Sequence, residues 1–104
     1  MAIVHVIAIL TAKPGQRDTV LTLFNANVPA VLAEDGCMFY EATIDAENVG
    51  LGKAAFGPDT FVVVEKWSCM VALNAHSSSA HMAAFGVAVK DMMADRSVHV
   101  LSPA

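Results

Sequence analysis

The order of apolar segments in this chain of 104 residues predicts an α+β fold. Segments with strand-like and helix-like periodicity follow one another as β-α-β and then again as β-α-β. This order is typical of a ferredoxin-like βαββαβ sandwich, in which an antiparallel sheet of four strands carries its helices on one face. The length is that of one domain, so we expect residues 1–104 to fold as a single unit.

The first half of the chain predicts a strand and then a helix. Residues 3–11 are apolar and β-branched at both parities, and Lys13-Pro14-Gly15 ends this strand. Pro29 predicts a bend or a break in the helix after Val28, and Gly36 is expected to cap its end. The apolar residues of the helix recur at intervals of three and four: Val20, Leu21, Phe24, Val28, Val31 and Leu32.

The second half of the chain predicts the same β-α-β order of elements. Ser68 is expected to be the N-cap of a short helix. The expected elements are a strand at 37–46, a loop at 46–58, a strand at 59–67, helices at 69–76 and 80–94, and a last strand at 97–101.

Two of the predicted strands are apolar on both sides. In residues 3–11, one face carries His5, Ile7 and Ile9, and the strand from residue 59 repeats this pattern in its first half. Helices cover only one face of such a sheet, so the other face needs a cover of its own. The same face of a second copy would provide it. We therefore expect a homodimer through the open sheet face, a dimeric α+β barrel.

Composition and charge exclude several functions. The chain has six Lys and Arg against ten Asp and Glu, a net charge of −4, and no cluster of three basic residues. Nucleic acids and anionic membranes need several positive contacts, so neither partner is expected. Without a long apolar run or a basic leader segment, the protein is expected to be cytoplasmic. There, Cys37 and Cys69 are expected to be small buried groups without a disulfide.

Histidines are the candidates for acid–base chemistry. His76 ends the short predicted helix, where the helix dipole favours the charged ring, and His81 opens the next, where it favours the neutral ring. A neutral imidazole in an apolar pocket can accept a proton from a substrate hydroxyl. The alternative is a half-buried structural histidine. The two positions are about 140° apart on a continuous helix, so they cannot share a face unless the Ser-rich break at 77–79 intervenes, and no metal site is expected from them.

One predicted strand face combines a carboxylate with large apolar groups. Glu65 and Trp67 share this face with Phe61 and Val63. A carboxylate in such surroundings either pairs with a partner or has a raised pKa, and a cross-strand ion pair is the alternative to a catalytic role. Trp67 is expected in the core or as the wall of an aromatic pocket. Residues 50–55 match a dinucleotide-binding pattern, but no helix follows, so we interpret them as a loop and expect no cofactor.

Five segments, in order along the chain, resemble the antibiotic biosynthesis monooxygenase (ABM) family. They are Lys13-Pro14-Gly15, residues 34–41, residues 61–67, residues 72–76 and His81-Met82. The resemblance covers nearly the whole chain and implies a dimer of ferredoxin-like domains. It also implies a cofactor-free oxygenase that acts on a quinol or polycyclic phenol with O2. An electron-rich phenolate can pass an electron to O2 unaided, so the protein need only bind it, deprotonate it and exclude water.

The resemblance places the site in an apolar pocket between sheet and helices. Val63 and Leu73 stand where polyketide-oxidising members carry an Asn and a Tyr. The stretch from His76 to Met82 is also similar to the branch that isomerises the phosphorylated autoinducer-2 signal. Isomerisation of a small phosphorylated ketone and non-catalytic binding of apolar aromatics are therefore the alternatives. The expected catalytic residues are His76, His81 and Glu65, and the expected substrate-binding residues are Trp67, Phe61, Val63, Tyr40, Leu73, Phe85 and His5.

Overall fold

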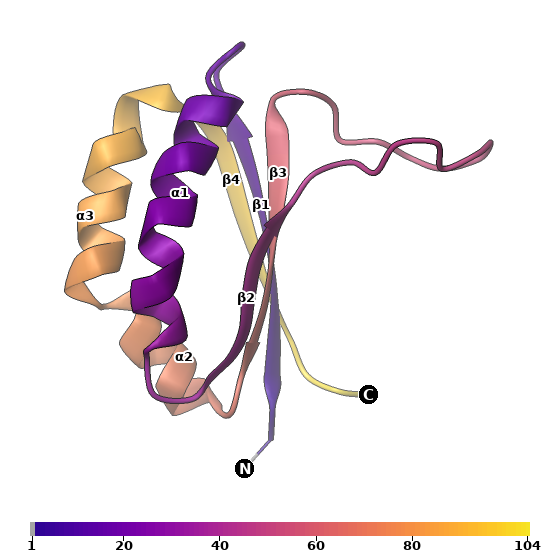
Figure 1. The fold of residues 1–104 in the computed structure, drawn as a ribbon. Helices are drawn as coiled ribbons and strands as arrows, with labels where there is room; N and C mark the ends of the chain where they lie inside the picture. Colours follow the sequence, from indigo (N-terminus) through magenta and orange to yellow (C-terminus); the bar gives the residue numbers. More distant parts are fainter. Residues whose placement is uncertain (1) are drawn as a thin grey trace.

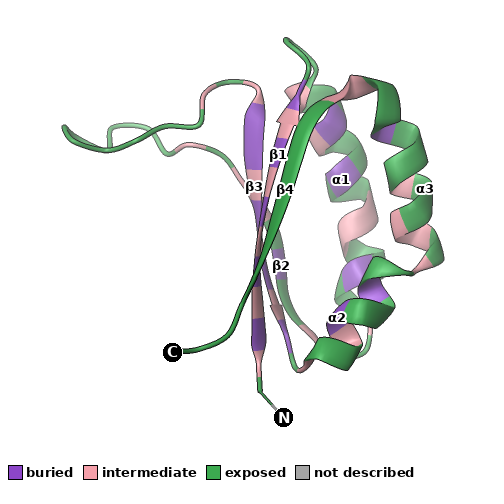
Figure 2. Cartoon of the chain, turned by 180° about the vertical axis from the view of Figure 1, so that it is seen from behind, coloured by how far each residue is buried: buried purple, intermediate pink, exposed green. Residues whose placement is uncertain are grey.

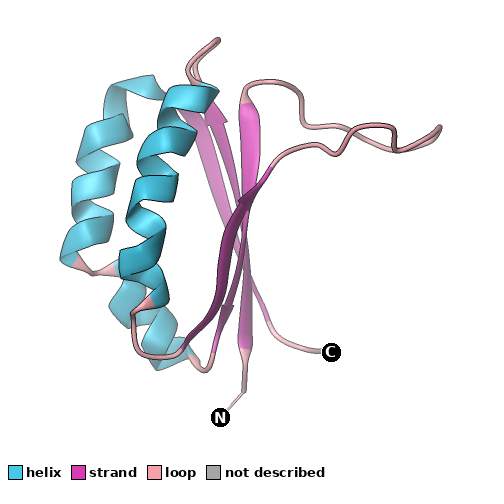
Figure 3. Cartoon of the chain, in the orientation of Figure 1, coloured by secondary structure: helices cyan, strands magenta, loops and turns pink. Residues whose placement is uncertain are grey.

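A computed structural model describes residues 2–104 as a helical layer packed on a four-stranded sheet (Figures 1 and 3). The strands are antiparallel and run in the order β2-β3-β1-β4. This is the ferredoxin-like α+β sandwich that the sequence predicts. The elements are β1 (Val4–Ala12), α1 (Arg17–Leu32), β2 (Cys37–Thr43), β3 (Thr60–Trp67), α2 (Met70–Ser77), α3 (Ala80–Val89), the 3-10 turn η1 (Lys90–Met92) and β4 (Met93–Leu101).

Alternation along the central strands builds the core. Every second residue of β1 from Val4 to Ala12 is buried beneath the helices, and β3 follows the same pattern. Phe24 of α1 lies at the centre of this layer. Its ring stacks on Tyr40 at 5.2 Å between centroids, and it meets Phe61 and Phe85 edge-on at 5.7 and 5.8 Å. These aromatic contacts join α1, α3 and the sheet in one packed unit.

The long first helix differs from its prediction. The break expected after Val28 is wrong, because α1 runs without interruption through Pro29 to Leu32. Proline cannot donate the hydrogen bond that the carbonyl of Asn25 would otherwise accept. Both Asn25 and Pro29 are exposed, so water can satisfy that carbonyl and the helix continues.

The boundary between the last helix and the last strand also differs. The expected helix over 80–94 ends at Val89, and β4 begins at Met93 rather than at residue 97. Ala12 pairs with Met93 across a register shift, and the Lys13 N–H donates to the Met92 carbonyl at 2.8 Å. Pairing with the end of β1 therefore overrides the helical periodicity of this segment. The second strand ends at Thr43, earlier than expected.

The face of the sheet opposite the helices has no covering layer within this chain. Ile7 pairs with Val64 and Ile9 with Val62 at its centre, and all four side chains are only half-buried (Figure 2). The loop of residues 44–59 projects from this side, as Figures 1 and 3 show. The two central strands thus carry apolar residues on both faces of the sheet, as predicted, and the face away from the helices is partly open to solvent.

No helix in residues 2–104 combines the length and the apolar character that a bilayer crossing requires.

Gly36 brings two distant parts of the chain into contact. Its carbonyl accepts the N–H of Ser68 at 2.8 Å, which joins the end of α1 to the start of α2. Its φ of +84° is left-handed, but the expectation that it caps the first helix is wrong, because α1 ends at Leu32 with Ala33 as its C-cap and Gly36 lies in the turn that follows. A Cβ atom here would lie 2.5 Å from the Ser68 Oγ and 2.6 Å from the Ala72 Cβ. Only glycine allows this approach.

We expect Gly36→Ala to lower the free energy of unfolding by about 2–4 kcal/mol, because the left-handed backbone and the clash with Ala72 both oppose it. Urea unfolding measures the loss. Gly15→Ala is the matched control, since Gly15 has a φ of +79° but no atom within 4 Å of the added Cβ. The control should lose about 1–2 kcal/mol. Equal losses in the two variants would contradict the close-contact explanation.

Candidate active site

A cavity of about 380 Å³ lies between the sheet and the three helices. Its floor is the buried face of β1 and β3, and its walls come from α1, α2 and α3. On the β4 side it is bordered by Lys90, Arg96 and Val98, which are exposed. Seven of the predicted site residues line it: Tyr40, Phe61, Val63, Glu65, Leu73, His76 and Phe85.

Three predicted site residues lie outside the cavity lining. His5 points to the opposite face of the sheet, as its pairing with Lys66 and its parity in β1 require. Trp67 is fully buried, and it supports the cavity from beneath instead of forming its wall. His81 stands at the start of α3, beyond the cavity, where its Nε2 contacts Glu34.

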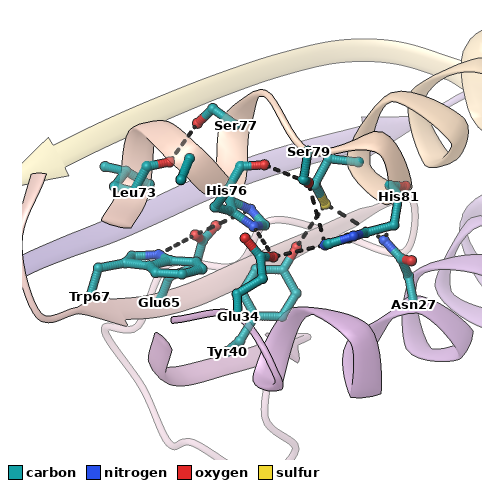
Figure 4. Close-up of polar contacts among 12 residues, drawn as sticks. Asn27, Glu34, Tyr40, Glu65, Trp67, Leu73, His76, Ser77, Ser79 and His81 are labelled. Atoms are coloured by element: carbon teal, nitrogen blue, oxygen red, sulfur yellow. Dashed lines mark hydrogen bonds and ion pairs between the residues drawn. The ribbon is translucent and has the colours of Figure 1, made fainter. Parts of the chain in front are cut away.

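A chain of polar side chains runs from the sheet to the helix junction (Figure 4). The indole Nε1 of Trp67 donates to the Glu65 Oε1 at 2.9 Å. That oxygen lies 4.0 Å from the His76 Nε2. On its other side, the His76 Nδ1 lies 2.8 Å from the Glu34 Oε2. The same Glu34 oxygen meets the His81 Nε2, also at 2.8 Å.

The helix break between α2 and α3 makes this meeting possible. α2 ends at Ser77 and α3 begins at Ala80, so His76 and His81 do not share one helix axis. The 140° separation expected on a continuous helix therefore does not apply. The Ser79 hydroxyl donates to the His76 carbonyl at 2.7 Å and stabilises the turn. Among residues 2–104, Glu34, His76 and His81 form a group whose donor atoms all lie within 4.8 Å of one another.

Glu34 sets the tautomer of His76. An ionised carboxylate can only accept hydrogen bonds, so the proton of the neutral imidazole must be on Nδ1. The Nε2 atom is then an unprotonated acceptor on the side of Glu65, and both residues line the cavity. Only 4% of His76 is exposed to solvent. The arrangement is that of a base oriented by a carboxylate.

Burial perturbs two acidic groups beside this base. Desolvation raises the pKa of the Glu65 carboxyl, and the hydrogen bond from Trp67 opposes the rise, as does the charge of His76 whenever that ring is protonated. Desolvation also raises the pKa of the Tyr40 phenol, and the carboxylates of Glu65 and Glu34 raise it further. Perturbed groups that line a cavity mark it as a candidate functional site.

Sequence reasoning missed Glu34 as a functional residue. The sequence points to it only as the first residue of the family-like segment 34–41, yet it lies at the centre of the polar chain. It is 42 residues away from His76 along the chain, and no local pattern connects the two. Its place at the start of that segment, two residues before Gly36, was the only available signal.

The two cysteines are free. Both are only partly buried, so the expectation that they are buried groups is wrong. Burial and the nearby Glu34 raise the pKa of the Cys37 thiol. Hydrogen bonding from the backbone N–H of Ala72 at the start of α2 lowers the pKa of the Cys69 thiol.

A ferredoxin-like α+β domain with an apolar cavity and a carboxylate-oriented histidine has the features of a site for a small molecule and for proton transfer. Comparisons with known proteins then give the family. The family model described as "Antibiotic biosynthesis monooxygenase" matches residues 3–87. The chain therefore belongs to the antibiotic biosynthesis monooxygenase family, and membership of that family supports an enzymatic, monooxygenase activity.

Similar proteins support this assignment. The protein named "Probable quinol monooxygenase YgiN" of Escherichia coli K12 is 36% identical over 100 residues, which covers 94% of this chain and 95% of that protein. The crystal structure of PA3566 from Pseudomonas aeruginosa has a TM-score of 0.82 at 22% identity, covering 100% of this chain and 96% of that one. The structure of Rv0793 from Mycobacterium tuberculosis has a TM-score of 0.80 at 26% identity, covering 99% and 96%.

Tyr40 allows a direct test of the site's burial, because it is the single tyrosine of the chain. The phenol pKa is raised well above its ordinary value of about 10, so the folded protein should show no tyrosinate absorbance at about pH 11. The urea-unfolded chain should titrate near the ordinary value. Because the folded state binds this proton more tightly, its contribution to stability is complete below the unfolded pKa and is lost as the pH rises above it. A tyrosinate step near pH 10 in the folded protein would contradict this burial.

Proposed function

We propose that this protein oxidises a quinol or polycyclic phenol with O2 and needs no cofactor. The observation that carries the proposal is the apolar cavity with a single oriented base, His76, in a chain of a monooxygenase family. Phe61, Val63 and Leu73 give the cavity the apolar surface that a flat ring requires. A quinol is also the substrate named for the relative from Escherichia coli. The cytoplasmic location expected from the sequence remains a prediction.

The proposed reaction begins with proton transfer. The Nε2 of His76 takes the hydroxyl proton of the bound quinol, and the Glu34 carboxylate stabilises the resulting imidazolium through Nδ1. Glu65 adds a second negative group 4.0 Å from Nε2. His81 does not reach the cavity lining, so we assign it a positioning role through Glu34. Without His81, the carboxylate would lose one of its two imidazole partners.

The electron-rich anion then reacts with O2. One electron passes to O2, the two radicals combine to form a ring C–O bond, and the O–O bond breaks with loss of water and of the ring hydrogen. Overall, a quinol and O2 give a hydroxyquinone and one water. One atom of the O2 molecule enters the hydroxyquinone and the other leaves as water. Once the substrate fills the apolar cavity, its walls exclude bulk water from the anion, which keeps the anion electron-rich.

We propose that the working unit is a homodimer through the open sheet face. Half-buried aliphatic side chains at the centre of this face, such as Ile7 and Val64, favour a second apolar surface over water. The loop of residues 44–59 projects on the same side and carries the exposed side chains of Leu51 and Phe56. Such a loop is positioned to pack against a second copy.

A second candidate function has one observation in its favour. Lys90 and Arg96 border the cavity, although the chain holds only six Lys and Arg. Two cations at the cavity border suit a phosphorylated ligand, as isomerisation of a small phosphorylated ketone requires. A thermal shift with phosphorylated ketones, absent with their unphosphorylated forms, would favour this function over quinol oxidation.

We expect His76→Asn to lower the rate of quinol-dependent oxygen uptake by about 100- to 10,000-fold, because the Asn amide replaces the Nδ1 donor but offers no base at Nε2. Oxygen consumption with menadiol-type quinols, above the rate of autoxidation, measures it in protein free of metal and flavin. Val87→Asn is the control, since Val87 is 78% exposed on α3, outside both the cavity lining and the open sheet face.

The proposed oxidation would be overturned by wild-type uptake no faster than autoxidation across a panel of quinols. Tight binding of an aromatic without turnover would instead identify a non-catalytic binding protein. Equal losses of turnover and of unfolding free energy in His76→Asn would assign His76 a structural role.

We expect the wild-type protein to sediment at about twice 10.9 kDa at micromolar concentration. Val64→Lys should yield a monomer, because it places a charge at the centre of the open face. Val87→Lys is the control, since Val87 is 78% exposed on α3, away from that face. A wild-type monomer, or a dimer unaffected by Val64→Lys, would contradict this interface.

A further inference from the structure

Two imidazole rings and one carboxylate converge on a single point at the helix junction. The Nδ1 of His76 and the Nε2 of His81 each lie 2.8 Å from the Glu34 Oε2, and Figure 4 shows both rings directed at it. All three donor atoms lie within 4.8 Å of one another. Side chains from the turn after α1, from α2 and from α3 thus bring three atoms that can ligate a metal around one small volume.

This donor set suits a cation of one chemical class. Divalent ions such as Zn2+ prefer imidazole nitrogen and carboxylate oxygen, and open sites often use three protein ligands with water as the fourth. Tetrahedral bonds of about 2.1 Å would separate the donor atoms by about 3.4 Å. The Glu34 oxygen must therefore move away from each ring by a few tenths of an ångström. Glu34 follows the C-cap residue of α1, where its side chain can adjust.

The surroundings meet two further requirements of a metal site. The far nitrogen of His76 faces the Glu65 carboxylate at 4.0 Å, and Trp67 holds that carboxylate through its indole N–H. Outer carboxylates of this kind orient metal-binding histidines. The second requirement is access. The His81 side chain is 29% exposed, so an ion can enter from that side and retain a water ligand.

We propose that Glu34, His76 and His81 form a binding site for a divalent transition-metal cation of the Zn2+ class. Binding displaces the ring proton from the Nδ1 of His76, and in a neutral ring this proton moves to Nε2. The proton of His81 moves in the same way from Nε2 to Nδ1, so no net proton is lost. The consequence for activity, which rests on the proposed function, is inhibition, because a protonated Nε2 no longer accepts the substrate proton.

Titration of metal-free protein with Co2+ tests the site directly. A tetrahedral histidine–carboxylate site should give visible ligand-field bands that saturate at one ion per chain and disappear when Zn2+ displaces Co2+. Glu34→Gln and His81→Ala should each weaken binding about tenfold or more. His99→Ala is the control and should bind as the wild type does, since His99 lies outside the cluster.

Three results would overturn the proposal. The first is the absence of saturable bands in the wild type, and the second is binding that survives both Glu34→Gln and His81→Ala in folded protein, as checked by thermal melting. A strong near-ultraviolet thiolate band would also overturn it, because it would place the ion on Cys37 or Cys69.

Oxygen uptake separates this proposal from the proposed function. Zn2+ should inhibit the wild type at the concentrations that saturate the optical titration, and the remaining activity of His81→Ala should be insensitive to it. If Zn2+ binds but uptake is unaffected, the metal site stands and the role of His76 as the base fails. If no quinol is oxidised at all, the optical titration still decides the metal site.

Discussion

The carboxylate of Glu34 lies where three parts of the chain meet, and the candidate site depends on it. It accepts hydrogen bonds from His76 and His81 across the break between α2 and α3. Its position follows from the close approach of Gly36 to Ser68, which ties the end of α1 to the start of α2. One backbone contact that only glycine permits thus orients an imidazole on the cavity wall.

A one-sided helical layer explains both the cavity and the open face. Three helices pack over the centre of the sheet but leave β4 exposed, so the space beneath them reaches solvent on that side (Figure 2). The opposite face keeps a half-buried aliphatic centre. A chain of this size cannot bury all its apolar surface within itself. The surplus is divided between the lining of the cavity and the half-buried centre of the open sheet face.

The buried polar chain from Trp67 to His81 lowers the folding stability, but it orients the side chains beside the cavity. Placing Glu65 beneath the helices raises its pKa, and Trp67 and His76 offset only part of that cost. Apolar residues of similar size would pack there without this penalty. Within residues 2–104, no buried side-chain nitrogen or oxygen lacks a hydrogen-bond partner. A satisfied polar chain beside an apolar cavity holds its members rigidly, which suits a site that must place a proton acceptor accurately.

Local patterns determined most of the fold. Alternation in β1 and β3, and the spacing of Val20, Phe24 and Val31, were sufficient for the element order and for the faces that are buried. The expected pocket came from the family resemblance instead, and His76, Glu65 and five other expected site residues do line the cavity. The start of β4 and the continuity of α1 were not predictable locally, because pairing with β1 and solvent access to one carbonyl decided them. The meeting of Glu34 with His76 and His81 was decided by the tertiary structure alone, since electrostatic contact depends on distance in space, and 42 residues of chain separate Glu34 from its first partner.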